Sequence, residues 1–304
     1  MLRAIGSVVL PPHATRNGFD HACVIPEADD LCVAHTANDA VEVIDLERRV
    51  HDATLPGFPG VAGVAVCPER HLLLATCRRE GHVATSPLRG ALTIRRIAVG
   101  ERPNGLAIAS SRGVALAACV GGEVGGPSMA VLDLSRGVVL ASGSLPGRPR
   151  WVVHDPDEGC FHVNVANPPE ILTFRDRPPF DVMRAVAMPV PGPHGLELDA
   201  ARGLLHCACD GGAIVTVEAG SGRVVAQVTI AGAPDVLFFN PRRDHLYVAI
   251  GDPGVLQVID TAVATVIETV PTGKDAHTLG FDREREHVYA FVPGSHSAAV
   301  FAEA

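Results

Sequence analysis

The chain consists of short apolar runs of four to seven residues, separated by polar or glycine-rich turns. The stretch 193–232, PHGLELDAARGLLHCACDGGAIVTVEAGSGRVVAQVTIAG, shows the pattern most clearly. A polar turn lies at Asp199–Gly203, a glycine pair at Gly211 and Gly212, and a further turn at Gly220–Gly222. Such a succession of apolar runs and turns predicts four consecutive β-strands, and no long helical period interrupts them.

The same four-strand unit recurs along the chain. Aligning the first apolar run of each copy places seven residues in one leading column, and the intervals between them are 41, 42, 46, 44, 41 and 42 residues. These residues are His21, Ala62, Asn104, Arg150, His194, Asp235 and His277. A period of 40 to 45 residues, each with four strands, is typical of β-propellers.

The two ends of the chain complete one another. The last copy supplies only three strands and ends at Ala299–Phe301, whereas the chain begins with an additional apolar run, Ala4–Leu10. Pairing this N-terminal strand with the last copy would close the ring and cover its exposed edges. The sequence therefore predicts an all-β, seven-bladed propeller of four antiparallel strands per blade, as a single domain over residues 1–304.

Composition and charge restrict the partners. The formal net charge is −9 and Lys274 is the only lysine, so the clustered cations of a nucleic-acid surface are not expected. No apolar run reaches the ~18 residues of a membrane span, and no signal-peptide pattern leads the chain. We expect a cytoplasmic protein that binds a small molecule and neither nucleic acid nor membrane. The oligomeric state is left open.

Several segments resemble a known repeat family. Leu246–Gly273, LYVAIGDPGVLQVIDTAVATVIETVPTG, is similar to the YVTN repeat of seven-bladed propellers, as are Leu31–Asp45 and Pro193–Asp199. The resemblance implies the propeller architecture over essentially the whole chain. It implies no single function, because propellers of this appearance include surface and binding proteins, lactonases, and streptogramin-cleaving lyases of similar size.

The leading column predicts a site at the mouth of the central channel. His194, Asp235, His277 and His21 belong to blades five, six, seven and one, which are consecutive around a closed ring. Their side chains are therefore expected on one side of the channel. Three imidazoles are suitable ligands for a divalent metal, so His21, His194 and His277 are predicted to bind Zn, Fe, Cu, Mn or Mg. The alternative is a hydrated polar channel without chemistry.

Further residues complete the predicted site. Asp235 is expected to orient a ligand or move a proton, and Arg150 to anchor an anionic group through its guanidinium. Asn104 lies beside Arg150 in the column and is a candidate for substrate binding. Trp151, the only tryptophan, either stacks on a ligand or plugs the channel.

Two rim histidines are also candidates. His35 and His296 follow the second strands of blades one and seven, which end on the same face as the channel mouth. His35 is a candidate general base and His296 a candidate substrate contact, while solvated loop histidines are the alternative. His13, in the long loop after the first strand, competes with His21 for the leading position of blade one.

Two functions follow from these assignments. The first is a metal-dependent propeller enzyme, a lyase or hydrolase that acts on a small ester, lactone or related anionic molecule at the channel mouth. The second is a noncatalytic propeller that binds a ligand or a protein with the same face. Bound metal that is lost on substitution of His194 would separate the two.

Overall fold

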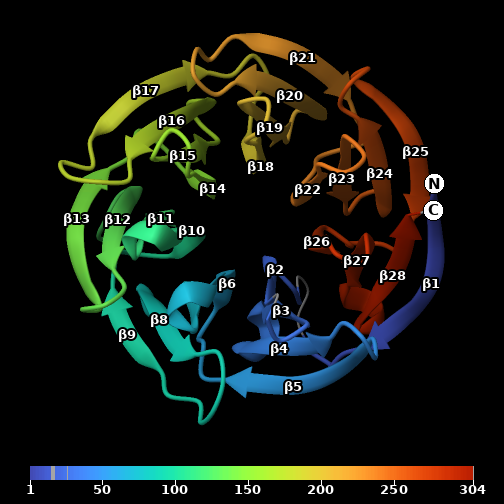
Figure 1. The fold of residues 1–304 in the computed structure, drawn as a ribbon, viewed down its shortest axis with the longest axis horizontal. Coiled ribbons are helices and arrows are strands. Elements are labelled where there is room, and N and C mark those ends of the chain that lie inside the picture. The colour runs from blue at the N-terminus through green and yellow to red at the C-terminus, as the bar shows by residue number, and fades with distance from the viewer. Residues whose placement is uncertain (15–17, 26, 304) are drawn as a thin grey trace.

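The computed structural model describes residues 1–14, 18–25 and 27–303 as seven four-stranded antiparallel sheets arranged around a central axis (Figure 1). The innermost strands are β2 (Ala22–Ile25), β6 (Val61–Cys67), β10 (Pro103–Ala109), β14 (Pro149–Asp155), β18 (Pro193–Asp199), β22 (Leu237–Asn240) and β26 (Thr278–Asp282). The predicted seven-bladed propeller is therefore confirmed.

The remaining strands follow each innermost strand outward. The second strands are β3 (Asp30–His35), β7 (Leu72–Cys77), β11 (Val114–Cys119), β15 (Cys160–Val165), β19 (Leu204–Cys209), β23 (His245–Ile250) and β27 (His287–Val292). The third strands are β4 (Ala40–Asp45), β8 (His82–Pro87), β12 (Ser128–Asp133), β16 (Glu170–Arg175), β20 (Ala213–Glu218), β24 (Val255–Asp260) and β28 (Ser297–Glu303). The outer strands are β1 (Leu2–Val9), β5 (Val50–Pro56), β9 (Arg95–Ala98), β13 (Val138–Ser144), β17 (Val182–Ala187), β21 (Val224–Thr229) and β25 (Thr265–Pro271).

Burial follows the position of each strand in its blade. All six residues of β11 are buried, because a middle strand packs against neighbouring blades on both faces. Along β5, exposed and half-buried residues alternate, as expected for an outer strand with one face in solvent. This difference explains why the middle strands appear as continuous apolar runs in the sequence. Among the described residues, no helix is long and apolar enough to cross a membrane.

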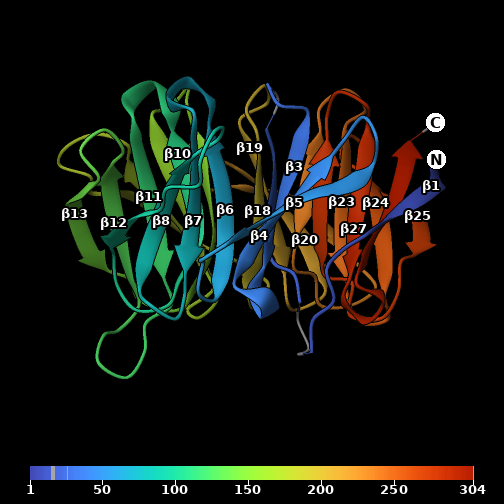
Figure 2. The same cartoon turned by 90° about the horizontal axis from the view of Figure 1, so that it is seen from below.

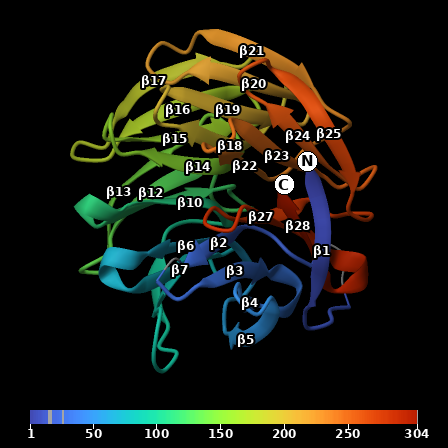
Figure 3. The same ribbon diagram turned by 45° about the vertical axis from the view of Figure 1, so that its right-hand side comes forward.

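The ring closes as the sequence predicts. Strand β1 pairs with β28 in antiparallel register and becomes the outer strand of the seventh blade, so the two termini lie side by side at the rim (Figures 1 and 3). A hydrophobic cluster spans the closure. It joins Val8, Leu10 and Phe19 of the N-terminal segment to Leu31 of blade one and Phe291 of blade seven.

Inter-blade contacts position the innermost strands at the mouth. The residue that follows the leading position is glycine in several blades, and a Cβ on Gly63 would lie 2.4 Å from the Asn104 carbonyl oxygen of the next blade. The hydroxyl of Thr76 accepts from Gly63 N at 2.7 Å and donates to the same carbonyl at 2.9 Å. In blade four, the Asn164 amide takes this position, accepting from Trp151 N and donating to the carbonyl of His194.

The direction of the strands places the leading residues on one face of the ring. Figure 2 shows the strands running between two faces of the ring. The residues at the start of the innermost strands of six blades line one cavity, so these strands begin at the same face. Because each second strand is antiparallel to the first, its C-terminal end returns to this face. The leading residues and the loops after the second strands therefore lie together.

Truncation of Leu10 should weaken the closure. Leu10 is 3% exposed in the closure cluster, whereas its neighbour Val9 is 76% exposed. We expect Leu10→Ala to lower the free energy of unfolding by about 2–5 kcal/mol through lost burial and the resulting cavity. Val9→Ala, the matched control, should change it by less than about 0.5 kcal/mol. Urea denaturation measures both, and equal losses would contradict the assigned role of Leu10.

Candidate functional site

A cavity of about 470 Å³ opens at the mouth of the channel. It contains six of the seven residues of the leading column, each from a different blade, together with residues of the rim loops. Its lining consists of Phe19, Asp20, His21, Thr36, Ala37, Arg78, Arg79, Asn104, Arg148, Arg150, His194, Asp235 and His277. The structure thus brings together the three predicted metal ligands, the predicted catalytic Asp235 and Arg150, and Asn104. Their functional roles remain predictions.

His194 is held between two carboxylates. Its Nδ1 lies 2.8 Å from Asp210 Oδ1 and its Nε2 lies 2.7 Å from Asp235 Oδ1. Burial alone would lower the pKa of His194, but the charge of Asp235 and the hydrogen bonds to both carboxylates outweigh it and raise the pKa to about 9. His194 is therefore an imidazolium at neutral pH and donates both of its ring protons.

The same contacts keep Asp235 ionised. Burial would raise the pKa of this carboxyl group, but the His194 charge and hydrogen bond, with a smaller contribution from His277, hold the pKa well below its usual range. Asp235 Oδ2 lies 3.8 Å from His277 Nε2. His277 Nδ1 donates to the carbonyl of Asp275 at 2.7 Å, which directs Nε2 toward Asp235. Asp235 therefore bridges the two histidines, as expected for neighbours in the ring.

The guanidinium of Arg150 lies beside His194 and Asp210. Its Nη1 lies 3.1 Å from His194 Nε2 and its Nη2 lies 3.4 Å from Asp210 Oδ2. Because the His194 Nε2 proton goes to the nearer Asp235 oxygen, Arg150 cannot donate to that nitrogen, and Asp210 is its compensating charge. The buried Arg150 Nε has no hydrogen-bond partner among the described residues. An unsatisfied buried guanidinium nitrogen is costly in free energy.

Trp151 lies beneath the cavity. It is 8% exposed and belongs to the hydrophobic core, and its ring stacks on His21 with centroids 3.8 Å apart and planes inclined by 31°. His21 Nε2 lies 3.3 Å from Asp20 Oδ1, yet burial lowers the pKa of His21 and favours the neutral imidazole. Trp151 is absent from the lining, so its placement agrees with the plug that the sequence analysis considered beside the ligand platform.

Three arginines of the lining had no role among the residues predicted from the sequence. Arg78 and Arg79 follow the second strand of blade two, and Arg148 precedes Arg150 by two residues. Arg78 Nη1 lies 3.0 Å from Asp20 Oδ2, and its Nη2 donates to Asn104 Oδ1. Burial, and then the adjacent Arg150, lower the pKa of Arg148. The signal for Arg78 and Arg79 was their place in a loop after a second strand, and the signal for Arg148 was its place two residues before a leading residue.

The lining therefore has a charge opposite to that of the whole chain. Four guanidinium groups and the His194 imidazolium face the carboxylates of Asp20 and Asp235, whereas the formal net charge of the protein is −9. A cavity with positive walls in an acidic protein concentrates small anions and repels large ones that must approach the negative surface.

Two predicted histidines, like Trp151, lie outside the cavity. His35 is fully buried, and its Nδ1 contacts Glu42 Oε1 at 2.7 Å. Phe19 separates it from the cavity, with its ring 4.6 Å from the ring of His35. His296 is also absent from the lining, and its Nδ1 lies 3.3 Å from Nδ1 of His13. The structure brings these histidines to one another rather than to the predicted substrate site.

The cavity histidines do not fit a common metal in this arrangement. A ligand nitrogen must offer a lone pair, but His194 Nε2 carries a proton for Asp235 and has the Arg150 guanidinium 3.1 Å away. Both the proton and the adjacent positive charge oppose a cation at this nitrogen. The predicted three-histidine site is therefore not assembled by these contacts, and no chemical step is derived from it.

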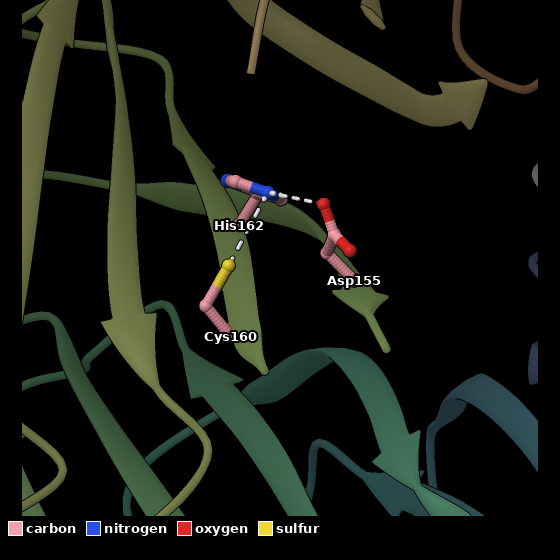
Figure 4. Close-up of side chains that lie close together, drawn as sticks. All are labelled: Asp155, Cys160 and His162. Carbon is pink, nitrogen blue, oxygen red and sulfur yellow. Dashed lines mark hydrogen bonds and ion pairs between the residues drawn. The ribbon is translucent and has the colours of Figure 1, made fainter. Parts of the chain in front are cut away.

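A different group is a candidate metal triad. Among the described residues, the donor atoms of Asp155, Cys160 and His162 lie within 4.8 Å of one another (Figure 4). His162 Nε2 is 3.6 Å from Cys160 Sγ and 3.8 Å from Asp155 Oδ2. All three residues are buried, and burial raises the pKa of the Cys160 thiol to about 12, which disfavours the thiolate that a metal requires.

The triad also repeats a structural feature of the blades. His162 Nδ1 contacts Thr173 Oγ1 at 3.0 Å, and in the next blade His206 Nδ1 contacts Thr216 Oγ1 at the same distance. Leu204 replaces Cys160 there. The histidine–threonine pair thus joins the second and third strands of a blade whether or not a cysteine is present.

Comparisons with known proteins identify the fold alone. No family model and no curated protein matches the sequence, so the YVTN resemblance stays a prediction. A chain of hydrazine synthase from Kuenenia stuttgartiensis is 15% identical with a TM-score of 0.86, covering 96% of this chain and 97% of that one. A chain of the mitotic checkpoint complex is 11% identical with a TM-score of 0.83, covering 99% and 91%. At such identities neither similarity transfers a function.

The environment of His194 can be measured directly. We expect its imidazole to titrate near pH 9 by NMR, and Asp235→Asn to lower that pKa. The control Asp157→Asn, at an exposed turn residue, should leave it unchanged. Because the pKa in the folded protein exceeds the ordinary histidine value of 6.5, the stabilisation from this group is complete below about pH 6.5 and is lost as pH rises through about 9. A value at or below 6.5 would contradict the two-carboxylate assignment.

Proposed function

We propose that the mouth cavity binds a small anionic molecule and that the Asp210–His194–Asp235 group transfers protons to it. The protein would then be a lyase or hydrolase acting on a small ester, lactone or related anion. The observation that carries this proposal is the convergence of Arg78, Arg79, Arg148 and Arg150 on one cavity in an otherwise acidic protein.

Arg150 and Arg148 supply the anchor for the anionic group. Arg150 lines the cavity, and its two terminal nitrogens can form a fork to a carboxylate or enolate oxygen. Asn104 is already directed by its amide donation to the Arg150 carbonyl at 2.9 Å and by Arg78 at its oxygen. The Asn104 amide therefore links Arg78 of blade two to the backbone of Arg150 in blade four. Asn104 would contribute to ligand binding by positioning Arg150.

His194 and Asp235 supply the proton transfer. The His194 imidazolium is a general acid toward a leaving or carbonyl oxygen, and Asp210 at its Nδ1 stabilises the charged ring. Asp235 accepts a proton from substrate or water once the ligand displaces its contact with His194. His277, 3.8 Å from the other carboxylate oxygen, is placed to take that proton onward. These proton transfers use only the side chains of His194, Asp210, Asp235 and His277.

Noncatalytic ligand binding is the second candidate. One observation favours it: His194 holds a carboxylate at each nitrogen, so a ligand must break a charge-assisted contact before the ring can react. The cavity would then serve as a receptor for an anion whose charge replaces that contact. Binding and turnover measurements on the same variants separate the two functions.

Anion binding should depend on Arg150. We expect a panel of small mono- and dicarboxylates, esters and phosphates to include a ligand that changes the fluorescence of Trp151, because this indole stacks on the cavity residue His21. Arg150→Gln should lower the affinity for that ligand by roughly 10- to 100-fold, because a hydrogen bond from a charged donor is lost. Arg48→Gln, at a 67% exposed residue remote from the lining, is the matched control. Equal affinity of the two variants for the ligand would contradict anion binding through Arg150.

Turnover should depend on Asp235. For any substrate found, we expect Asp235→Asn to lower kcat by about 10²- to 10⁴-fold, the usual contribution of a positioned acid or base, while binding remains measurable. The rate of the wild-type protein should fall as pH rises through about 9, where His194 loses its proton. A ligand that binds through Arg150 but is never converted would instead establish the noncatalytic receptor.

A further inference from the structure

Two arginines occupy equivalent positions in neighbouring blades. Arg102 and Arg148 each lie two residues before the leading residue of their blade, and a proline follows each of them. Their innermost strands, β10 and β14, are neighbours in the ring (Figure 1). The other five blades carry no cation at this position, where the residues are Phe19, Gly60, Gly192, Ala233 and Asp275. The arginine pair is therefore a feature of blades three and four and not of the repeat.

The backbone holds both arginines in the same way at the channel mouth. The Arg102 carbonyl accepts from Val120 N at 3.0 Å, and the Arg148 carbonyl accepts from Ala166 N at 2.9 Å. Arg148 lines the mouth cavity together with Arg150, which lies two residues along the chain. The Cα atoms of these two residues are at most roughly 7 Å apart, because that is the length of two fully extended residues. A short ligand can therefore reach both side chains.

Arg102 adjoins the mouth cavity from blade three. It lines a second cavity, of about 600 Å³, and Arg78 belongs to the linings of both cavities. Burial lowers the pKa of Arg148, and the charges of Arg150 and then of Arg102 lower it further. The two equivalent arginines are thus near enough to repel one another. An anion that contacts both guanidinium groups would relieve this repulsion.

The other arginines of the mouth already have carboxylate partners. The ion pairs are Arg78 with Asp20, Arg79 with Asp39, and Arg150 with Asp210. By contrast, neither the Arg102 nor the Arg148 guanidinium forms an ion pair or a hydrogen bond with any residue that the structure describes. Two positive charges at the rim of the mouth therefore lack a compensating carboxylate in contact with them.

The acidic residue next to Arg102 is engaged elsewhere. Glu101 Oε2 accepts from the backbone N–H of Val124 at 3.2 Å and from that of Gly125. These contacts direct the Glu101 carboxylate to the glycine-rich loop after β11. The guanidinium groups of Arg102 and Arg148 thus stay available to an anion from solution.

We propose that Arg102 and Arg148 form a second anion subsite at the rim of the mouth cavity, and that the ligand is a small dianion. One anionic group would lie at Arg150 and the other at the rim pair, whose guanidinium groups can each donate to a carboxylate oxygen. A short-chain dicarboxylate is the simplest ligand of this class. The inference rests on the anion binding proposed above for Arg150, and it adds the charge of the ligand.

The test compares matched carboxylates by isothermal titration calorimetry. Succinate, glutarate and adipate are each paired with the monocarboxylate of the same carbon number, butyrate, valerate or hexanoate. Low ionic strength is used because salt screens exposed charges. We expect at least one dicarboxylate to bind more tightly than its partner by roughly 3- to 30-fold, the range for two exposed ion pairs. An Arg102→Gln, Arg148→Gln double variant should abolish this preference.

Two further variants separate the rim subsite from the anchor at Arg150. Arg136→Gln is the matched control, because Arg136 is a 75% exposed arginine of blade three that lines neither cavity, and it should keep the preference. Arg150→Gln should weaken both members of each ligand pair. Circular dichroism checks that every variant folds.

The outcomes distinguish the two proposals. The rim subsite is overturned if no dicarboxylate binds more tightly than its monocarboxylate partner, or if the preference survives in the folded double variant. Weaker monocarboxylate binding by Arg150→Gln would in that case leave the anchor standing alone. If the preference requires the rim pair while Arg150→Gln changes neither affinity, the rim subsite stands and the anchor at Arg150 is wrong.

Discussion

The close approach of neighbouring innermost strands at the channel mouth is the constraint on which the rest of this structure depends. Gly63 leaves room for the Asn104 carbonyl, and the buried Thr76 hydroxyl joins the two blades across that gap. Asn164 makes the corresponding link from Trp151 to His194. Because these polar groups are buried, breaking them would leave unsatisfied donors and acceptors, which costs more than the bonds themselves contribute. These hydrogen bonds therefore fix the position of the leading side chains at the mouth of the channel.

Electrostatics then decide what the mouth can do. The same ring that brings His194 near Asp235 also brings Arg150 to the other side of its imidazole, with Asp210 behind them. Two carboxylates favour the imidazolium form of His194, and the surrounding guanidinium groups require counter-ions. A cavity of this composition is suited to anions and proton transfer.

Ring closure connects the cavity to the stability of the fold. A propeller closed by its N-terminal strand has one junction that is not covalently continuous within a blade, and here β1 and β28 form it. Phe19 lies at this junction with one side toward the cavity and the other toward His35 and Phe291. Ligand binding at the mouth and stability of the junction therefore share a side chain, although they use different polar groups.

The sequence alone determined the architecture and the leading column, because a repeat of 41 to 46 residues records local strand and turn preferences that each blade satisfies in the same way. It therefore predicted the closure by the N-terminal strand and six cavity residues. Only the tertiary structure decided their partners. Asp210 beside His194, Arg78 beside Asn104 and Glu42 beside His35 depend on how rim loops and third strands meet across space. These contacts set the protonation state of each group. His194, which the sequence predicts as a metal ligand, is an imidazolium because Asp210 and Asp235 lie at its two ring nitrogens, and spacing along the chain does not show those neighbours.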